Sequence, residues 1–386
     1  MTTQGPLSGV TVVDLSRVLA GPFCTLVLAD LGARVIKVDV PGAGDDSRHF
    51  GPFVAGRSAY FMSLNRGKES IALDLKVAED RSIFDALLAR ADVLVENFRP
   101  GTMERLGFSW ESLHERHPRL IYAAVSGFGR TGPYSHRAAY DIIVQAMGGV
   151  MSLTGDPDGP PVRVGTSLGD IAAALFLAVG VNAALYRRTV TGRGMLVDVA
   201  MLDAQVAILE NAIARYVTTG SVPGRLGARH PSITPFDAFA AADGHLVIAA
   251  GNDALFRRLC AVLGRDDLAD NPLFSTNDCR TVHHAALKEE LESVLRLRPV
   301  EQWLIALEKA GVPCGPINTV DKVLADPQVA HRNMAVSTTD PIAGTLVLAG
   351  NPIKFSDFPD PSSRSPAPEL DGDRERILEM LEREEQ

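Results

Sequence analysis

The chain has 386 residues, of which 46% are hydrophobic and 22% are charged, and its formal net charge is −9. A chain of this length and composition can bury large apolar cores and favours two domains over one. Because the net charge is negative and no basic tract is present, a nucleic-acid or anionic-membrane partner is not expected, and any polyanionic ligand needs a local basic site.

The N-terminal residues and the cysteines indicate a cytoplasmic protein. Residues 1–9 lack a charged region followed by an apolar core, so no signal peptide is expected. The longest uncharged run, Ile171 to Tyr186, is shorter than the roughly 20 residues that a membrane-spanning helix needs. The four cysteines show neither metal-ligand nor disulfide-type spacing and are expected to be structural thiols: Cys24, Cys260, Cys279 and Cys314.

The N-terminal half alternates apolar strand patterns with helical patterns. Strands are predicted at residues 10–15, 34–38, 71–75, 92–96, 120–125 and 195–200. Helices are predicted from Gly21-Pro22 through Leu31 and at residues 78–91, 171–188 and 202–218. Strands that are separated by helices indicate an α/β fold with a mostly parallel, Rossmann-like sheet and helices on both faces.

The pattern changes beyond about residue 222. A loop is followed by a predicted hairpin at 236–239 and 243–248 and by helices at 253–263, 281–297 and 300–311. We therefore predict three parts: a large α/β domain at 1–222, a smaller α+β domain at 223–325, and a C-terminal segment at 326–386 that returns to the large domain. Short elements are predicted in that segment at 345–348 and 372–384, with a Pro- and Ser-rich surface connector from Ser356.

Asp170 is the leading candidate for covalent chemistry, because it follows the mostly apolar segment 162–169 and precedes the uncharged run. A carboxylate at a helix start faces unpaired backbone N–H groups and the positive end of the helix dipole, which would keep it ionised and nucleophilic. Gly169 would leave one side of this carboxylate open to a large electrophile. The competing interpretation is a simple helix N-cap, since Asp is among the commonest capping residues.

Residues 127–132, GFGRTG, match the dinucleotide-binding fingerprint after a predicted strand. That fingerprint requires a helix directly after the glycines and an acidic residue at the end of the next strand, whereas Pro133-Tyr134-Ser135-His136 follows here. A nicotinamide cofactor is therefore not expected. We interpret the turn as a tight loop at the carboxyl end of the sheet, where ligands of such folds bind.

Eight short segments form an ordered pattern over nearly the whole chain: LSRVLAGP at 15–22, VIKV at 35–38, LNRGK at 64–68, VENFRPG at 95–101, GFGRTGP at 127–133, LGD at 168–170, TGRG at 191–194 and GVPCGP at 311–316. Together they resemble the class III CoA-transferase family, which includes formyl-CoA and carnitine CoA-transferases. Each segment alone has low specificity, but eight in register are highly specific. The resemblance implies that Asp170 is the catalytic nucleophile.

The resemblance also implies an acyl-CoA:carboxylate CoA-transferase. The Asp170 carboxylate would attack the thioester carbonyl, giving an aspartyl mixed anhydride and free CoA thiolate. The acceptor acid would then enter, and the reaction would pass through a second anhydride and an aspartyl-CoA thioester that retain the energy of the thioester. CoA would be a substrate, and no metal or permanently bound cofactor is implied.

The family match further implies a CoA groove, with Lys76 and Arg105 near phosphates and Phe98 against the adenine or pantetheine. The implied lining residues are Val18, Leu73, Lys76, Asn97, Phe98 and Arg105. Taken alone, these residues also fit ordinary roles, such as sheet-core Val and Leu, a helix-start Lys and a solvated Arg. Val40 follows the second strand, where the formyl-CoA branch often has a basic residue, so part of that branch's phosphate contact is not expected here.

α-Methylacyl-CoA racemases share the implied fold and are the alternative. They carry a His before the Asp that follows the Gly-Pro turn, whereas this chain has Tyr140-Asp141. Abstraction of an α-proton needs two bases, and a tyrosine with an ordinary pKa of about 10 is poorly suited to that role. Transfer is favoured, with Tyr140 either bonded to a carboxylate or the anhydride, or packed in the core. The intact Asp170 argues against a third class, a catalytically silent CoA-binding protein.

The acceptor and the assembly are expectations from the same resemblance. The stretch 225–255 has no adjacent glycines like those of the formyl-CoA branch, which favours an acceptor other than oxalate, such as succinate or a branched C5 acid. Arg229 or His230 would then lie near its distal carboxylate.

Family members form dimers in which two chains interlock as rings, so we expect a homodimer with linkers near 222 and 325. The apolar helix at 202–218 lacks a full polar face, so we expect another part of the assembly to pack against it.

Overall fold

The computed structural model describes residues 4–383, and the chain divides into two compact units. Unit 1 takes in the chain up to Val150, Arg163–Thr219 and the chain from Asp326, whereas unit 2 consists of Met151–Val162 and Gly220–Ala325. The sequence placed residues 151–162 in the large domain, but they belong to the smaller unit. The reason is local, because the Arg225 guanidinium donates to the backbone carbonyls of Asp156, Pro157 and Gly159.

Unit 1 is built on a six-stranded sheet, and the predicted parallel arrangement is confirmed: every neighbouring pair is parallel. The strands are β1 (Thr11–Asp14), β2 (Arg34–Asp39), β5 (Glu69–Ala72), β6 (Val93–Glu96), β7 (Ile121–Ser126) and β8 (Leu196–Ala200). They lie in the order β5-β2-β1-β6-β7-β8. Chain order therefore runs outward in one direction from β1 and in the other from β6, which is the doubly wound arrangement.

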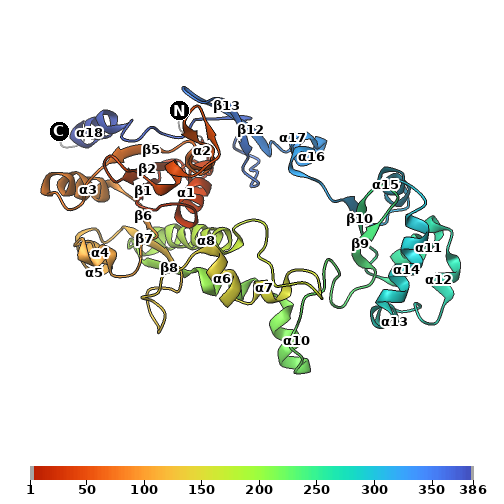
Figure 1. Ribbon diagram of the computed structural model, residues 1–386. Coiled ribbons are helices and arrows are strands. Elements are labelled where there is room, and N and C mark those ends of the chain that lie inside the picture. Colours follow the sequence, from red (N-terminus) through yellow and green to blue (C-terminus); the bar gives the residue numbers. More distant parts are fainter. Residues whose placement is uncertain (1–3, 384–386) are drawn as a thin grey trace. The chain divides into compact units, whose positions relative to one another are not determined.

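Helices cover both faces of this sheet because successive strand residues point to opposite sides. Val12 and Ile121 belong to the core cluster that includes residues of α1 (Ala20–Asp30) and α8 (Leu168–Thr191). Both helices are labelled beside the sheet in Figure 1. The neighbouring residues Val13 and Tyr122 belong to the core cluster of the other face. The helices of that second face are α3 (Ala78–Arg90), α4 (Thr102–Arg105), α5 (Trp110–Arg116) and α18 (Arg374–Arg383).

The remaining elements that begin in unit 1 are short. The helical ones are η1 (Asp46–His49), α2 (Ala59–Asn65), α6 (Asp141–Met147), α7 (Val150–Leu153), α9 (Met201–Ala207), α10 (Asn211–Thr219) and α17 (Pro327–His331). The strands are β3 (Phe53–Val54), β4 (Arg57–Ser58), β12 (Ala335–Asp340), β13 (Gly344–Ala349) and β14 (Ser363–Arg364). The predicted short element near 345–348 is thus one strand of a hairpin.

The prediction of a single helix at 202–218 is wrong. The chain forms α9 and α10 instead, and Glu210 between them has a φ of 53°. A left-handed residue cannot continue a right-handed helix, so the path breaks there. The predicted helix at 281–297 is likewise divided, into α13 (Asn277–Val282) and α14 (His284–Leu295).

Unit 2 combines a small antiparallel sheet with helices. The predicted hairpin is present as β9 (Phe236–Ala240) and β10 (His245–Ala249), and β11 (Cys314–Pro316) pairs with β10. The sheet and helices enclose a core that includes Trp303, whose indole N–H donates to the Leu295 carbonyl at 2.7 Å. The other helices of this unit are α11 (Asp253–Leu263), α12 (Asp266–Asp270), α15 (Val300–Lys309) and α16 (Val320–Ala325).

Helix α8 has 24 residues and is, by length and composition alone, apolar enough to cross a membrane. Core helices of globular proteins pass the same test. Ala173, Leu177 and Val181 of α8 are fully buried in the cluster between the sheet and α1. This packing gives α8 a place in the core of unit 1, and the absence of a membrane partner stays a prediction.

Candidate functional site

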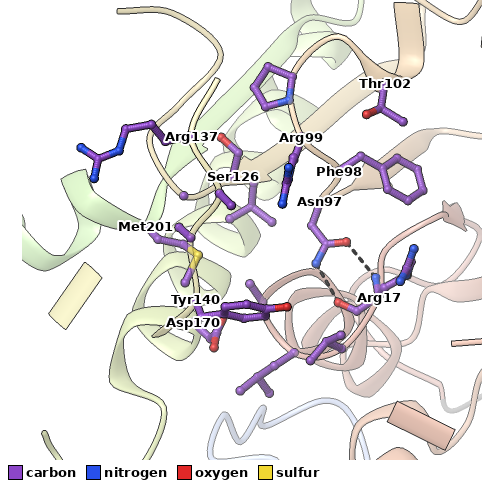
Figure 2. A pocket seen from close by; sticks show the side chains of 18 of the residues that line it. Arg17, Asn97, Phe98, Arg99, Thr102, Ser126, Arg137, Tyr140, Asp170 and Met201 are labelled. Atoms are coloured by element: carbon purple, nitrogen blue, oxygen red, sulfur yellow. Dashed lines mark hydrogen bonds between the residues drawn. The ribbon is translucent and has the colours of Figure 1, made fainter. Parts of the chain in front are cut away.

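A pocket of about 420 Å³ lies in unit 1 at the carboxyl ends of β1, β6 and β7 (Figure 2). Its walls come from the loops after these strands, with side chains of α8 and α9. The strand order reverses between β1 and β6, which is where doubly wound folds bind ligands. The lining residues that bear on the chemistry are Arg17, Val18, Asp46, Asn97, Phe98, Arg99, Ser126, Arg137, Tyr140, Asp170 and Met201.

Asp170 is half-buried in this lining, in the first turn of α8. Ser167 precedes the first helical residue and occupies the N-cap position, so the interpretation of Asp170 as an N-cap is wrong. Within residues 4–383 the Asp170 carboxylate accepts no hydrogen bond and forms no ion pair. The carboxylate is therefore free of structural partners in the pocket.

The expected protonation state of Asp170 also needs correction. Burial raises the pKa of Asp170 to about 7, and the negative charge of Asp141 adds to this increase. The helix N-terminus was expected to keep the carboxylate ionised, but desolvation and a like charge outweigh it. Asp170 is accordingly a basic carboxylate that changes its ionisation near neutral pH.

Gly169 has a different role from the one expected. A Cβ at this buried position would lie 2.6 Å from Val144 Cγ2 and 3.0 Å from Asp141 Oδ1. Glycine is needed at this position because α8 approaches α6 this closely.

Tyr140 lies at the start of α6 with 75% of its surface exposed, and it lines the pocket close to Asp170 in Figure 2. The interpretation of Tyr140 as a core aromatic is therefore wrong. In the described part of the chain its hydroxyl has no hydrogen-bond partner, so it is available to a ligand.

Asn97 lines the pocket, but both polar atoms of its amide are engaged by the loop after β1. Its Oδ1 accepts from the Arg17 N–H at 2.8 Å, and its Nδ2 donates to the Arg17 carbonyl at 2.7 Å, as the dashed lines in Figure 2 show. Asn97 thus fixes the position of this loop. The neighbouring Phe98 also lines the pocket, and its N–H donates to the buried Glu96 carboxyl at 2.7 Å.

Val18 is a loop residue in the pocket wall rather than a sheet-core valine. Its φ of 67° is unfavourable for a β-branched side chain and must be held by the surroundings. The Val18 N–H donates to the Asp45 carboxylate at 3.1 Å, and Asp45 pairs with the fully buried Lys37 at 2.9 Å. Lys37 also donates to the Ser16 carbonyl at 2.6 Å, so a buried ion pair fixes the turn on both sides of Arg17.

Leu73, Lys76 and Arg105 are not among the residues that line this pocket. Leu73 is 2% exposed in the sheet core, whereas Lys76 and Arg105 are exposed and Arg105 donates to Thr102 Oγ1 at 2.9 Å. Their role in CoA binding stays a prediction. The cations that do line the pocket were missed: Arg17, Arg99 and Arg137. The signal for Arg17 and Arg99 was their place beside Val18 and Phe98, directly after strands.

The residues considered for the acceptor lie in unit 2. Arg229 lines a separate pocket of about 560 Å³ together with His284 and Lys288. The His230 ring packs against Phe236, with 5.5 Å between ring centroids. Neither observation tests a contact with the acceptor. Val40, where the formyl-CoA branch often has a basic residue, is 53% exposed.

Comparison with known proteins places this fold and site in one family. The sequence profile of CoA-transferase family III matches residues 7–374. An acetyl-CoA:oxalate CoA-transferase from Acetobacter aceti is 50% identical over 369 residues, which are 95% of this chain and 94% of that protein. A succinate–glutarate CoA-transferase from Agrobacterium fabrum is 40% identical over 384 residues, which are 98% and 96% of the two chains.

A solved structure agrees with this assignment. The crystal structure of a CAIB/BAIF family protein from Brucella suis has a TM-score of 0.87 and 40% identity, and it covers 98% of this chain and 100% of its own. The match extends over both units and over the loops that form the pocket. The chain therefore belongs to CoA-transferase family III and is a CoA-transferase.

Proposed function

We propose that this enzyme transfers CoA from an acyl-CoA thioester to a carboxylic acid through covalent intermediates on Asp170. The observation that supports this most directly is the Asp170 carboxylate itself. It is half-buried, has no hydrogen-bond partner within residues 4–383, and lines the pocket where the strand order reverses. A carboxylate that only stabilised the fold would be engaged by a donor or fully solvated.

In the proposed reaction the ionised Asp170 carboxylate attacks the thioester carbonyl, and the C–S bond breaks to give an aspartyl mixed anhydride and CoA thiolate. The thiolate then attacks the aspartyl carbonyl, which releases the donor acid and leaves an aspartyl-CoA thioester. The acceptor carboxylate attacks that thioester, which forms a second anhydride and releases the CoA thiolate. The thiolate then attacks the acceptor's acyl carbonyl in this anhydride, which gives the new acyl-CoA and frees the Asp170 carboxylate. Each bond that forms replaces one of similar energy, so the thioester energy is retained.

Acyl-CoA is the proposed substrate, and the route requires no further cofactor because the nucleophile is a side chain. The three arginines of the pocket are the proposed contacts for the CoA phosphates. Arg17 is paired with the exposed Asp46, and the Arg137 guanidinium lies 4.7 Å from the centroid of the Tyr134 ring. Arg99 is exposed, and in the described residues its guanidinium forms no ion pair or hydrogen bond.

The proposed acceptor is a short dicarboxylic acid. A relative that is 50% identical is named for oxalate, one that is 40% identical for succinate and glutarate, and one that is 42% identical for mesaconate. All of these acids carry two carboxylates. The expectation that oxalate is not an acceptor has no support from the relative at 50% identity, so oxalate belongs among the candidates.

The test is incubation of the enzyme with acetyl-CoA or succinyl-CoA and a set of acids that includes oxalate, succinate, glutarate and acetate. Formation of the new acyl-CoA, followed by chromatography, is the expected result. Exchange of the α-proton with deuterium from solvent, without an acceptor, would indicate a racemase instead. Neither reaction with any donor would indicate a protein that only binds CoA.

Replacing Tyr140 with phenylalanine should reduce kcat for transfer by about 10-fold and leave α-proton exchange absent, as in the wild type. The reason is that the exposed hydroxyl is proposed to donate to a carboxylate or to the anhydride, and a hydrogen bond to a charged group contributes roughly 1.5–3 kcal/mol. Tyr134→Phe, a tyrosine that does not line the pocket, is the control. An unchanged kcat for Tyr140→Phe would contradict this role.

We also propose that the enzyme is a homodimer with interlocked chains in the cytoplasm. One face of α8 carries large apolar side chains that this chain leaves exposed, at positions spaced like a helical stripe. The residues are Leu175, Phe176, Val179, Tyr186 and Val190. A second copy of the chain would cover this stripe, and interlocking would prevent the copies from separating while folded.

A dimer of this kind should not dissociate on dilution, because separation would require unfolding. Sedimentation velocity with a labelled protein should give a single dimeric species from micromolar to nanomolar concentration. The oligomer should be lost at the same urea concentration as the far-UV circular dichroism signal. A folded and active monomer at nanomolar concentration would refute the interlocked assembly.

A further inference from the structure

We propose that Asp141 is the positioning residue for Asp170: it supplies the capping bond that the N-cap residue Ser167 does not make, and so leaves the Asp170 carboxylate free in the pocket. The inference deepens the proposed function, since it assigns the device that prepares the nucleophile. Asp141 does not line the pocket itself and acts through the start of the helix.

The first turn of an α-helix has N–H groups without partners inside the helix, and a side chain at the N-cap usually accepts from one of them. The N-cap residue of α8, Ser167, makes no such bond. Instead Asp141, the first residue of α6, accepts from the Gly169 N–H through Oδ1 at 2.8 Å. The capping acceptor of α8 thus comes from a different helix.

Asp141 is itself held in place. The Gln145 Nε2 donates to both Asp141 oxygens at 2.9 Å, one turn along α6. Gln145 is fully buried, and its Oε1 accepts from the Val164 N–H at 2.9 Å. On the other side, the Arg163 guanidinium lies 3.6 Å from Asp141 Oδ2. The acceptor is therefore fixed by a buried amide and faces one exposed cation.

This arrangement has two consequences for Asp170. The Asp170 carboxylate does not accept a capping hydrogen bond. Such a bond would stabilise the charged form and so lower the basicity of Asp170. The charge of Asp141 also adds to burial in raising the pKa of Asp170 to about 7. A more basic carboxylate is a stronger nucleophile, and the repulsion between the two carboxylates ends when Asp170 becomes an anhydride.

Other charged and titratable groups also lie around Asp170. Tyr60 on α2 has its pKa raised to about 12 by burial and then by Asp170, so its phenol is neutral at pH 7. The groups that share the pocket are Arg17, Asp46, Arg99, Arg137 and Tyr140. Those on the elements packed against α8, and on α8 itself, are Cys24, Asp30, Tyr122, Asp141, Asp198, Asp203, Tyr186, Arg187 and Arg188.

Two substitutions that should shift the pKa of Asp170 in opposite directions test the inference. Asp141→Asn keeps an oxygen for the Gly169 N–H but removes the charge. The acidic limb of the pH profile of kcat/KM should therefore move down by about one pH unit. At pH 8 kcat should be lower than in the wild type, and KM for acyl-CoA should stay within about 2-fold of the wild-type value. Arg163→Gln removes the exposed cation near Asp141 and should move the same limb up by a few tenths of a unit. Asp85→Asn, on the opposite face of the sheet, is the charge-matched control and should move nothing.

A second readout is independent of turnover. A water-soluble carbodiimide modifies protonated carboxyl groups, so the pH midpoint of Asp170 modification, followed by peptide mass spectrometry, reports its titration. We expect this midpoint to shift in the same directions as the acid limb. An unshifted midpoint in both variants would overturn the role of Asp141, even if Asp170 is still acylated by substrate. Absence of acylation of Asp170 in the wild type would instead overturn the proposed function, and the positioning role with it.

Discussion

Replacing Asp170 with alanine should lower the rate of CoA transfer by at least about 10⁴-fold, because the variant lacks the group that is proposed to form the covalent intermediates. Acyl-CoA binding should change by no more than a few-fold, since Asp170 occupies one side of a pocket that several loops form. Steady-state assays and isothermal calorimetry measure the two quantities. Asp203→Ala, on the exposed side of α9, is the control and should retain full activity.

Trapping should identify the same residue. Hydroxylamine added during turnover reacts with an acylated carboxyl group, so peptide mass spectrometry should find a hydroxamate at Asp170 and not at Asp141. Near-normal turnover by Asp170→Ala, or a label at another carboxylate, would remove the basis of the proposed mechanism.

The raised pKa of Asp170 also predicts an effect on stability. Its folded value of about 7 lies above the ordinary value of 3.8, so between these pH values the folded state binds more protons than the unfolded state. The contribution of Asp170 to stability is therefore present below about pH 4 and is lost as the pH rises through 7. Asp170→Asn should accordingly stabilise the protein at pH 8 by roughly 1–3 kcal/mol, and by much less at pH 4, in urea unfolding.

Replacing Lys37 with methionine should destabilise the protein by about 3–5 kcal/mol, because it leaves buried carboxylates without their cation. Lys37 is fully buried and lies 2.9 Å from Asp45 and 3.8 Å from Asp39. Burial lowers the pKa of Lys37, but the carboxylates Asp14, Asp45 and Asp39 outweigh it and hold that pKa above its ordinary value. Lys37 is therefore charged in the folded protein.

The same substitution should weaken the pocket, since Lys37 and Asp45 hold the strained turn at Val18. Urea unfolding measures the loss of stability, and KM for acyl-CoA measures the effect on the pocket. Arg257→Met, which removes an exposed pair with Asp270, should change stability by less than about 1 kcal/mol. A change below 1 kcal/mol for Lys37→Met as well would mean that the buried pair contributes little.

Local sequence patterns were sufficient to predict most strands and helices of the large unit. Mostly apolar runs such as 10–15 and 120–125 predicted strands within one or two residues of β1 and β7, because a strand buried on both faces is largely apolar. The spacing between these strands predicted the helices that cover the sheet. The eight motif segments then indicated the family, and with it Asp170 as the residue to examine.

Other features depended on contacts between segments that are distant in the sequence. The break at Glu210 is a single left-handed residue inside a helical pattern, which periodicity does not report. Lys76 and Arg105 have the right charge for phosphates, yet Arg17, Arg99 and Arg137 are the arginines that line the pocket. Which cations face a pocket is decided by how the loops fold.

The sequence by itself determined the parallel sheet, the flanking helices and the position of Asp170 at the start of a long helix, because these follow from apolar periodicity and from motifs that lie along the chain. Only the tertiary structure decided the chemical state of that residue. The sequence predicted a carboxylate kept ionised by the helix, whereas Asp141 accepts from the Gly169 N–H and burial raises the pKa of Asp170 to about 7. The physical reason is that burial and the distance to another charge belong to the folded chain and have no local signal in the sequence.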